Sequence, residues 1–407
     1  MDTLVPAVPA ADKGAIARAI MAGLFASLVG IGLARFAYTP LIPALIDARW
    51  FSSHDVVYLG AANLVGYLAG AVAGRAVARR AGARRTLQLM MLAASLAFFA
   101  CAFPLSVSWF FAWRFLSGVA GGIIMVLAAS TVLPHIPANR RGLGGGAIFL
   151  GVGLGVAASG TLGPVLMEYG LRATWGGLGL LSLLLTALSW HCWPRDAHAD
   201  GAPPVRAGAK APLTLELKLL YLQYGLMAVG LVPMMVFLVD YVARGLNMGT
   251  HEAAKFWVVY GLGAIAGPML YGAVADRIGP APTSRIATAV QAAAIAVLVL
   301  SGDHGALLVA TFISGTFPPG VVPLTLARLH QALPGDVQAQ GAAWSRATTI
   351  FALFQALAGY GYSYLFAASS QDHRLLLAVG GWTLVFGLAL DGALLWWRRA
   401  ARPARRV

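Results

Sequence analysis

The sequence predicts an all-α integral membrane protein in which twelve transmembrane helices form two parallel six-helix repeats. Three observations lead to this fold class: an apolar composition, a succession of apolar segments of membrane length, and an internal repeat. Of the 407 residues, 59% are hydrophobic and only 11% are charged. Because a water-soluble globule has too little interior to bury so much apolar surface, lipid must be the solvent for much of the chain.

Apolar segments of about 20 residues, the length that crosses a hydrocarbon core as a helix, recur along nearly the whole chain. They are rich in Ala, Leu and Val, and the 48 glycines suit closely packed membrane helices better than barrel strands. We therefore expect twelve spans, near residues 18–46, 55–74, 86–104, 107–133, 142–167, 172–192, 214–240, 253–275, 284–301, 305–330, 338–367 and 374–397.

The basic residues fall mainly on one side of this topology. Lys and Arg near helix ends favour the cytoplasmic side, and here they are concentrated in the tails and the even-numbered loops. Both termini are therefore expected in the cytoplasm, and the net charge of +14 is a consequence of topology. Nucleic-acid binding is not expected, because the basic residues form no single patch. The opposite loops hold only Arg49, Arg172, Arg244, Lys255 and Arg374.

The second half of the chain repeats the first. A shift of 197 positions places Gly66 on Gly263 and Gly118 on Gly315, among other glycine and proline matches. Each half has an even number of spans, so both copies have the same orientation in the membrane. The expected segments are an N-terminal tail at 1–17, a six-helix half at 18–192, a cytoplasmic linker at 193–213, a second half at 214–397 and a basic tail at 398–407.

Several motifs resemble those of the major facilitator superfamily. "GAVADRIG" at 272–279 is similar to its loop signature, and "RFLSGVAGG" at 114–122 and "GAIAGPMLYG" at 263–272 are similar to two of its helix patterns. "GIGLARFAYTPLIPAL" at 30–45 resembles the first-helix signature of the bacterial YbfB/YjiJ-type transporters, whose substrates are poorly defined. The resemblance implies a secondary transporter of the bacterial inner membrane. Its halves would rock around a central site lined by helices one, four, seven and ten and bordered by helix eleven.

Arg35 lies in the middle of the first predicted span. At 1.5 Å per residue it is about 25 Å from Arg18 and about 18 Å from Asp47, which places it near the centre of the bilayer. A charge there is costly unless it faces water, a partner or a ligand. In a regular helix Arg35 shares a face with Tyr38 and Thr39, and a guanidinium with nearby hydroxyls is a good receptor for a carboxylate or phosphate.

A structural role for Arg35 is the alternative. Pro40 and Pro43 lack amide donors, so Arg35 would then donate to the carbonyl groups that they leave free. Arg114 and Arg346 are the other cations within predicted spans, and both are candidate substrate contacts. For Arg114 the alternative is that its side chain extends to the outer surface.

The predicted spans offer few carboxylates to these arginines. Asp47, Glu168, Asp240 and Glu252 fall at outer ends, and Asp391 lies on a twelfth helix that is expected to face away from the cavity. This favours an anionic substrate and counts against efflux of cationic drugs. Protons are a candidate coupling ion, and His330 is the one histidine placed to titrate, although it lies at a helix end.

The resemblance also implies a cytoplasmic gate. Asp276, followed by Arg277, occupies the position of the superfamily's loop aspartate and would dock at the start of the fifth span. In the first half the equivalent residues are basic, so a second contact with exchanged charges is a hypothesis; the alternative is that these arginines only set the topology. The gate residues are Asp276 and Arg277 with Arg140 and Arg141, and Arg79 and Arg80 with Asp336.

We therefore predict a secondary active transporter that moves a small solute, with an organic anion preferred, by alternating access. The alternatives are an exporter of amphipathic compounds and, from another class, a non-transporting membrane sensor. No enzyme motif, metal site or cofactor is expected, because the spans lack paired carboxylates, a nucleophile elbow or a His-Glu metal motif. The expected partners are a small molecule, the bilayer and a candidate proton, and the chain is expected to be a monomer.

Overall fold

The computed structural model describes residues 13–137, 141–194 and 213–400. Within these ranges the chain is helical and contains no β-strand. The first predicted span is a composite of α1 (Lys13–Ser27), the π-helix η1 (Leu28–Leu33), α2 (Ala34–Phe36), the 3-10 helix η2 (Thr39–Leu41) and α3 (Ile42–Asp47). The other helices of the first half are α4 (Ser53–Ala81), α5 (Ala83–Cys101), α6 (Val107–Val132), α7 (Arg141–Met167) and α8 (Leu171–Ser189).

The second half has the same number of spans. It consists of α9 (Leu215–Asp240), continued by the π-helix η6 (Tyr241–Gly245), then α10 (Gly249–Ile278), α11 (Pro280–Leu300), α12 (His304–Ala332), α13 (Val337–Ala368) and α14 (His373–Ala400). In the described ranges, eleven helical segments are long and apolar enough to cross a membrane. The remaining predicted span is α5, whose first turn carries Arg84 and Arg85 and so lowers its mean hydropathy. Each of the twelve predicted spans thus coincides with a helical segment.

One boundary differs in a way that matters for the gate. α4 continues from the predicted end at residue 74 to Ala81, so Arg75, Arg79 and Arg80 lie on a helix and not in a loop. Arginines near a helix C-terminus interact favourably with the helix dipole, which supports this extension. The helix ends at Gly82, whose φ of 82° lies in the left-handed region.

The repeat found in the sequence is also a repeat of contacts. A Cβ added at Gly66 would lie 2.0 Å from the carbonyl oxygen of Phe115, and one at Gly263 would lie 2.1 Å from that of Phe312. Both pairs are related by the same shift of 197 residues. Helices α4 and α6 of the first half therefore pack backbone to backbone as α10 and α12 do in the second, as expected for glycine-rich membrane helices.

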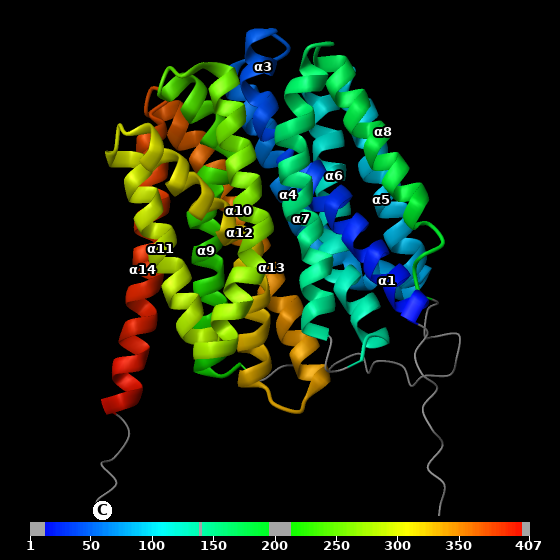
Figure 1. Cartoon of the computed structure of the whole chain (residues 1–407), viewed down its shortest axis with the longest axis vertical. Helices are drawn as coiled ribbons and strands as arrows, with labels where there is room; N and C mark the ends of the chain where they lie inside the picture. Colours follow the sequence, from blue (N-terminus) through cyan, green and yellow to red (C-terminus); the bar gives the residue numbers. More distant parts are fainter. Residues whose placement is uncertain (1–12, 138–140, 195–212, 401–407) are drawn as a thin grey trace, which may run out of the picture.

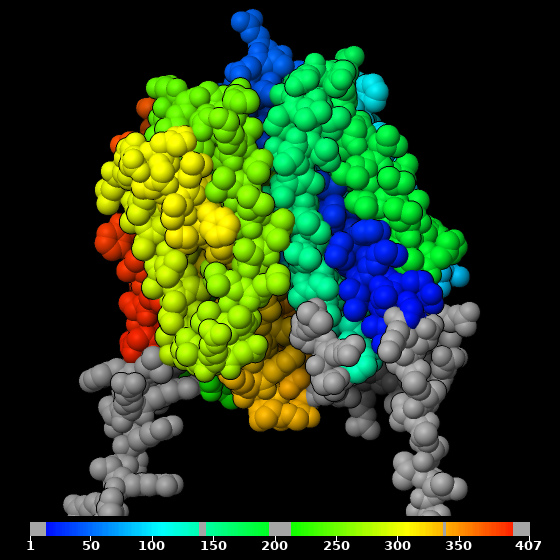
Figure 2. Space-filling view, viewed as in Figure 1, coloured from blue at the N-terminus to red at the C-terminus, as the bar shows by residue number. Residues whose placement is uncertain are grey.

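Figure 1 shows the two halves side by side, with their helices roughly aligned along one direction. We call the end at which α1 begins and α14 finishes the terminal end, and the opposite end, where α3 lies, the far end. Across the interface α7 packs against α10, and α4 packs against α13. Figure 2 shows α7 and α10 meeting on one face of the molecule.

Candidate functional site

The first span is interrupted where the sequence places Arg35. Gly30 and Gly32 lie in the π-helix η1, and Pro40 lies in the 3-10 helix η2, so Arg35 occupies the short α2 between two irregular turns. A Cβ at Gly32 would lie 2.8 Å from the Cα of Gly155 on α7, so the two backbones touch. The expected interruption by prolines is observed, and π-turns within helices are frequent at functional sites.

Arg35 is buried and lacks an anionic partner. Its side chain is 9% exposed, and its Nε and Nη2 have no hydrogen-bond partner among the described residues. The guanidinium carbon lies 4.8 Å from the ring centroid of Tyr67 on α4, a cation–π contact. The side chains of Tyr260 on α10 and Arg114 on α6 also lie within electrostatic range of the Arg35 guanidinium. Arg35 therefore lies between the two halves without a carboxylate.

Arg114 does not extend to the surface. It is 3% exposed, its Nη1 donates a 2.8 Å hydrogen bond to the carbonyl oxygen of Ala34, and its guanidinium carbon lies 4.3 Å from the ring centroid of Tyr38. The alternative considered for Arg114 is therefore wrong. It is Arg114, and not Arg35, that supports a backbone carbonyl of the interrupted first span.

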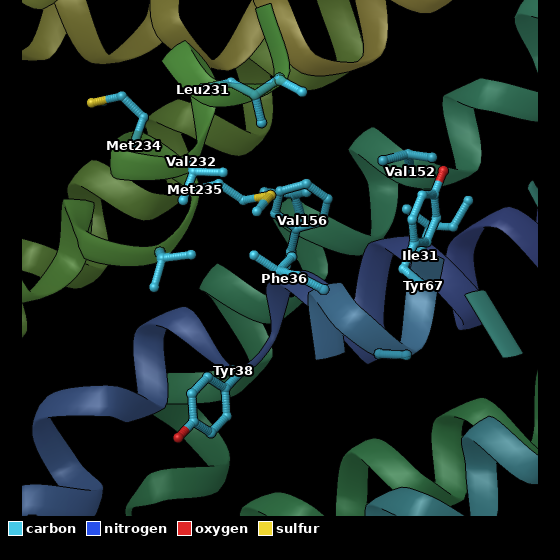
Figure 3. Packing of buried hydrophobic residues seen from close by; sticks show 14 of the residues in the cluster. Ile31, Phe36, Tyr38, Tyr67, Val152, Val156, Leu231, Val232, Met234 and Met235 are labelled. Carbon is cyan, nitrogen blue, oxygen red and sulfur yellow. The ribbon is translucent and has the colours of Figure 1, made fainter. Parts of the chain in front are cut away.

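Tyr38 and Thr39 do not join Arg35. The Tyr38 hydroxyl donates to the carbonyl oxygen of Val56 at 2.6 Å, and the Thr39 hydroxyl donates to that of Met235 at 2.6 Å. Figure 3 shows the Tyr38 ring pointing away from Phe36 and Tyr67. The expected shared face assumed a continuous α-helix, whereas the chain changes to a 3-10 turn at Thr39. The Thr39 bond instead links the first half to α9 of the second.

Arg346 lies apart from these residues. Its guanidinium carbon is 6.0 Å from the ring centroid of Tyr221 on α9, and its side chain is half-buried on α13, nearer the terminal end. The structure thus brings Arg35 and Arg114 together and places Arg346 beside Tyr221.

Asp391 is neutralised within the second half. It is 4% exposed, and it accepts a 2.7 Å hydrogen bond from the Nε2 of Gln223. It also forms ion pairs with Arg285 and, at 3.5 Å, with Arg328. This cluster joins α9, α11, α12 and α14. The positive-inside pattern alone predicts only a topological role for these two arginines. The signal that could have found the cluster is that an aspartate within an apolar span requires cations on neighbouring helices.

Asp240, expected at an outer end, is buried there as well. It pairs with Arg244 one turn later and with the Nε2 of His373 at 2.7 Å, at the start of α14. The side chain of Asp240 is 1% exposed. Both buried aspartates are therefore paired in the second half, and neither compensates the charge of Arg35.

The structure describes the side chains of only some of the predicted gate residues. Asp336 accepts a 2.8 Å hydrogen bond from the backbone N–H of Ala339 and so caps α13. Among the described residues it forms no ion pair with Arg79 or Arg80, whose side chains are exposed. Asp276 and Arg277 are exposed on α10. Arg140 lies outside the described residues, as does the side chain of Arg141. The expected contact of Asp276 therefore stays a prediction.

A residue that was not predicted for the gate joins the halves near the terminal end. The Nη2 of Arg75 donates a 2.7 Å hydrogen bond to the carbonyl oxygen of Gly341 on α13. With the second span predicted to end at residue 74, Arg75 falls in a cytoplasmic loop, whereas the extension of α4 carries it toward α13. Toward the far end the halves meet through the Trp257 indole, which donates to the Ser159 hydroxyl at 3.0 Å.

A duplicated helical bundle of membrane-spanning dimensions, with a buried cation between its halves, has the architecture of a membrane transporter. Residues 27–392 match the family described as the uncharacterised MFS-type transporter YbfB, and the chain belongs to that family. It is therefore a transporter of a small solute and not an enzyme.

Individual relatives agree with this assignment. The chain is 27% identical over 278 residues to the 3-(3-hydroxy-phenyl)propionate transporter of Escherichia coli strain K12, an alignment that covers 65% of this chain and 66% of that protein. Two structures of XylE share the fold at a TM-score of 0.73. One is the proton:xylose symporter bound to 6-bromo-6-deoxy-D-glucose, at 14% identity over 93% of this chain and 95% of that chain. The other is the partially occluded inward-open xylose transporter from E. coli, at 13% identity over 93% and 99%.

Proposed function

We propose that the protein moves a small organic anion across the bacterial inner membrane by alternating access, and that Arg35 binds the anion. The observation that carries this proposal is the buried guanidinium without a carboxylate. Isolated charges are rarely buried unless they are paired, and an uncompensated cation in a membrane span indicates an anionic ligand. The structural alternative is weakened because Nε and Nη2 of Arg35 donate to no carbonyl group among the described residues.

The relative named for 3-(3-hydroxyphenyl)propionate supports a carboxylate in particular, since its named substrate is a carboxylic acid. A planar guanidinium binds a carboxylate through two parallel hydrogen bonds. Nε and Nη2 of Arg35, the two nitrogens without partners, lie on one edge of the guanidinium and can form such a pair.

Alternating access is supported by the contacts between the halves. Thr39 with Met235 and Ser159 with Trp257 hold the far half of the interface closed, so a path to Arg35 in this conformation would open from the terminal end. We propose that the terminal end is cytoplasmic, with both termini there, and that the protein acts as a monomer. Closure of that end would bring Asp276 to Arg140 or Arg141, and Arg79 or Arg80 to Asp336.

Transport of radiolabelled carboxylates into proteoliposomes tests the proposal. Panels of mono- and dicarboxylates, organic cations and sugars are compared in the wild type and Arg35→Ala. We expect uptake or exchange of a carboxylate class that is lost in Arg35→Ala and weakened in Arg35→Lys, which keeps the charge but not the planar fork. Lys255→Ala, which removes an exposed cation, serves as the control. Transport of a carboxylate by Arg35→Ala at the wild-type rate would contradict the role of Arg35.

A further inference from the structure

The hydroxyl of Tyr260 is a polar group of the second half that the contacts of the fold do not explain. Tyr260 is fully buried on α10, its hydroxyl has no hydrogen-bond partner among the described residues, and it lies within electrostatic range of the Arg35 guanidinium. A buried hydroxyl without a partner destabilises a fold by about 1–3 kcal/mol, and each case in a native structure calls for an explanation.

The Tyr260 side chain is held in place by both halves. Its ring stacks on that of Trp257 with a centroid distance of 5.1 Å and an interplanar angle of 9°. The Trp257 indole is fixed in turn by its hydrogen bond to Ser159 on α7 of the first half. A Cβ at Gly315 would lie 2.0 Å from the Tyr260 carbonyl oxygen, so the backbone is also locked against α12. The free hydroxyl is therefore not explained by a loosely packed ring.

The repeat shows what the same position does in the first half. Asn63 is the counterpart of Tyr260 at the shift of 197, and its carbonyl oxygen contacts Gly118 as that of Tyr260 contacts Gly315. The Asn63 amide donates to the Ser117 hydroxyl at 2.9 Å, so it is satisfied inside its own half. With equivalent backbones, the two side chains differ in what they bind, and Tyr260 keeps a donor available at the interface.

We infer that Tyr260 supplies the second hydrogen bond to the substrate, so that an anion is held between Arg35 of the first half and Tyr260 of the second. This inference rests on the proposed function, in which Arg35 binds the anion. A phenol donates a strong hydrogen bond to a carboxylate oxygen, because the acceptor is charged. The contact belongs to both halves, so it forms fully only when they close around the substrate.

The surroundings indicate an aromatic monocarboxylate. Among the described residues of this region, Arg35 has two guanidinium nitrogens without an acceptor, whereas Arg114 donates to Ala34 and lies over Tyr38, so a single anionic group is matched. Where the first half has Arg114, the second has Thr311, so it adds no charge. The rings of Phe36 and Trp257, 6.4 Å apart across the interface, and the Tyr67 ring beside Arg35 provide flat apolar surfaces that suit an aromatic body.

Binding of 3-phenylpropionate to the purified full-length protein, measured by calorimetry, tests this inference. Tyr260→Phe is expected to weaken binding by about 10- to 100-fold, the effect of one charge-assisted hydrogen bond. Tyr362→Phe is the matched control, because it also removes a buried tyrosine hydroxyl, on α13 and beside Thr383 of α14. It is expected to leave the Kd unchanged. Phthalate, a dianion, and 3-phenylpropanol, which is neutral, are expected to bind at least tenfold more weakly than 3-phenylpropionate.

The other possible results distinguish failure of the Tyr260 contact from failure of the proposed function. Loss of binding in Arg35→Ala with wild-type affinity in Tyr260→Phe overturns the role of Tyr260 and leaves the proposed function standing. Equal binding in wild type, Arg35→Ala and Tyr260→Phe overturns both. Stronger binding of phthalate than of 3-phenylpropionate overturns the monocarboxylate. In the absence of ligand, Tyr260→Phe is expected to melt at or above the wild-type temperature; a fall would show that the hydroxyl has a structural partner and would overturn the inference.

Discussion

The Nη1 of Arg114 donates a 2.8 Å hydrogen bond to the carbonyl oxygen of Ala34, the residue immediately before Arg35. The two arginines therefore have different surroundings although both are buried near the same turn. Arg114 has a backbone acceptor and the Tyr38 ring, whereas Arg35 has the Tyr67 ring and two nitrogens without acceptors. Removing the Arg114 charge should therefore lower the unfolding free energy, whereas removing the Arg35 charge should not.

Arg114→Met is expected to destabilise the ligand-free protein, because it leaves the buried Ala34 carbonyl without its donor, at a cost of about 1–3 kcal/mol. Arg35→Met is expected to leave the stability unchanged or raise it, since an unpaired buried charge is replaced by an apolar side chain. Thermal melts of the two variants in the same detergent measure the difference. A lower melting temperature for Arg35→Met than for Arg114→Met would refute this division of roles.

Asp391→Asn is expected to be the most destabilising single change in the second half. It leaves Arg285 and Arg328 close together without a carboxylate, and breaking a buried ion pair costs about 3–5 kcal/mol. Chemical or thermal unfolding in detergent gives the measurement. Glu252→Gln is the control, because that residue pairs with the exposed Lys255 and such pairs contribute about 0–1 kcal/mol. Equal losses in the two variants would show that the Asp391 cluster contributes little.

Thr39→Val is expected to favour opening of the far end, because it removes the hydrogen bond to Met235 that links the halves. One neutral hydrogen bond contributes about 0.5–1.5 kcal/mol, so the open population should rise by about 2- to 10-fold. Alkylation of a cysteine introduced at Tyr360, which contacts Tyr58 across the interface, reports the opening. The native Cys101 and Cys192 are replaced for this experiment.

Thr161→Val is the control for this measurement. Its hydroxyl donates to the Ala157 carbonyl of its own helix at 3.0 Å, so the variant removes a threonine hydroxyl without touching the contact between the halves. An equal alkylation rate in wild type and Thr39→Val would show that the Thr39 bond does not hold the far end closed.

The helices and the repeat could be predicted from the sequence because they depend on patterns within single segments. Apolar length defines each span, and the glycine at 66 and its counterpart at 263 mark close helix contacts. The partners of the charged side chains could not be predicted in this way. Asp391 and Arg285 are 106 residues apart, and their pairing depends on how α11 and α14 pack. The expected grouping of Arg35 with Tyr38 failed for a local reason, since it assumed a regular helix where π and 3-10 turns occur.

Gly66→Ala is expected to separate α4 from α6 and lower the stability of the first half. The added Cβ would lie 2.0 Å from the Phe115 carbonyl oxygen, which is backbone and cannot move aside as a side chain would. Overpacking of this kind typically costs about 1–3 kcal/mol. Gly146→Ala on α7 is the matched control: its Cβ would meet nothing within 4 Å, so the substitution should be neutral or stabilising through the higher helix propensity of alanine. Thermal melts of both variants make the comparison, and equal melting temperatures would contradict the backbone contact. Gly263→Ala should reproduce the loss in the second half, because the repeat places that glycine 2.1 Å from the Phe312 carbonyl oxygen in the same way.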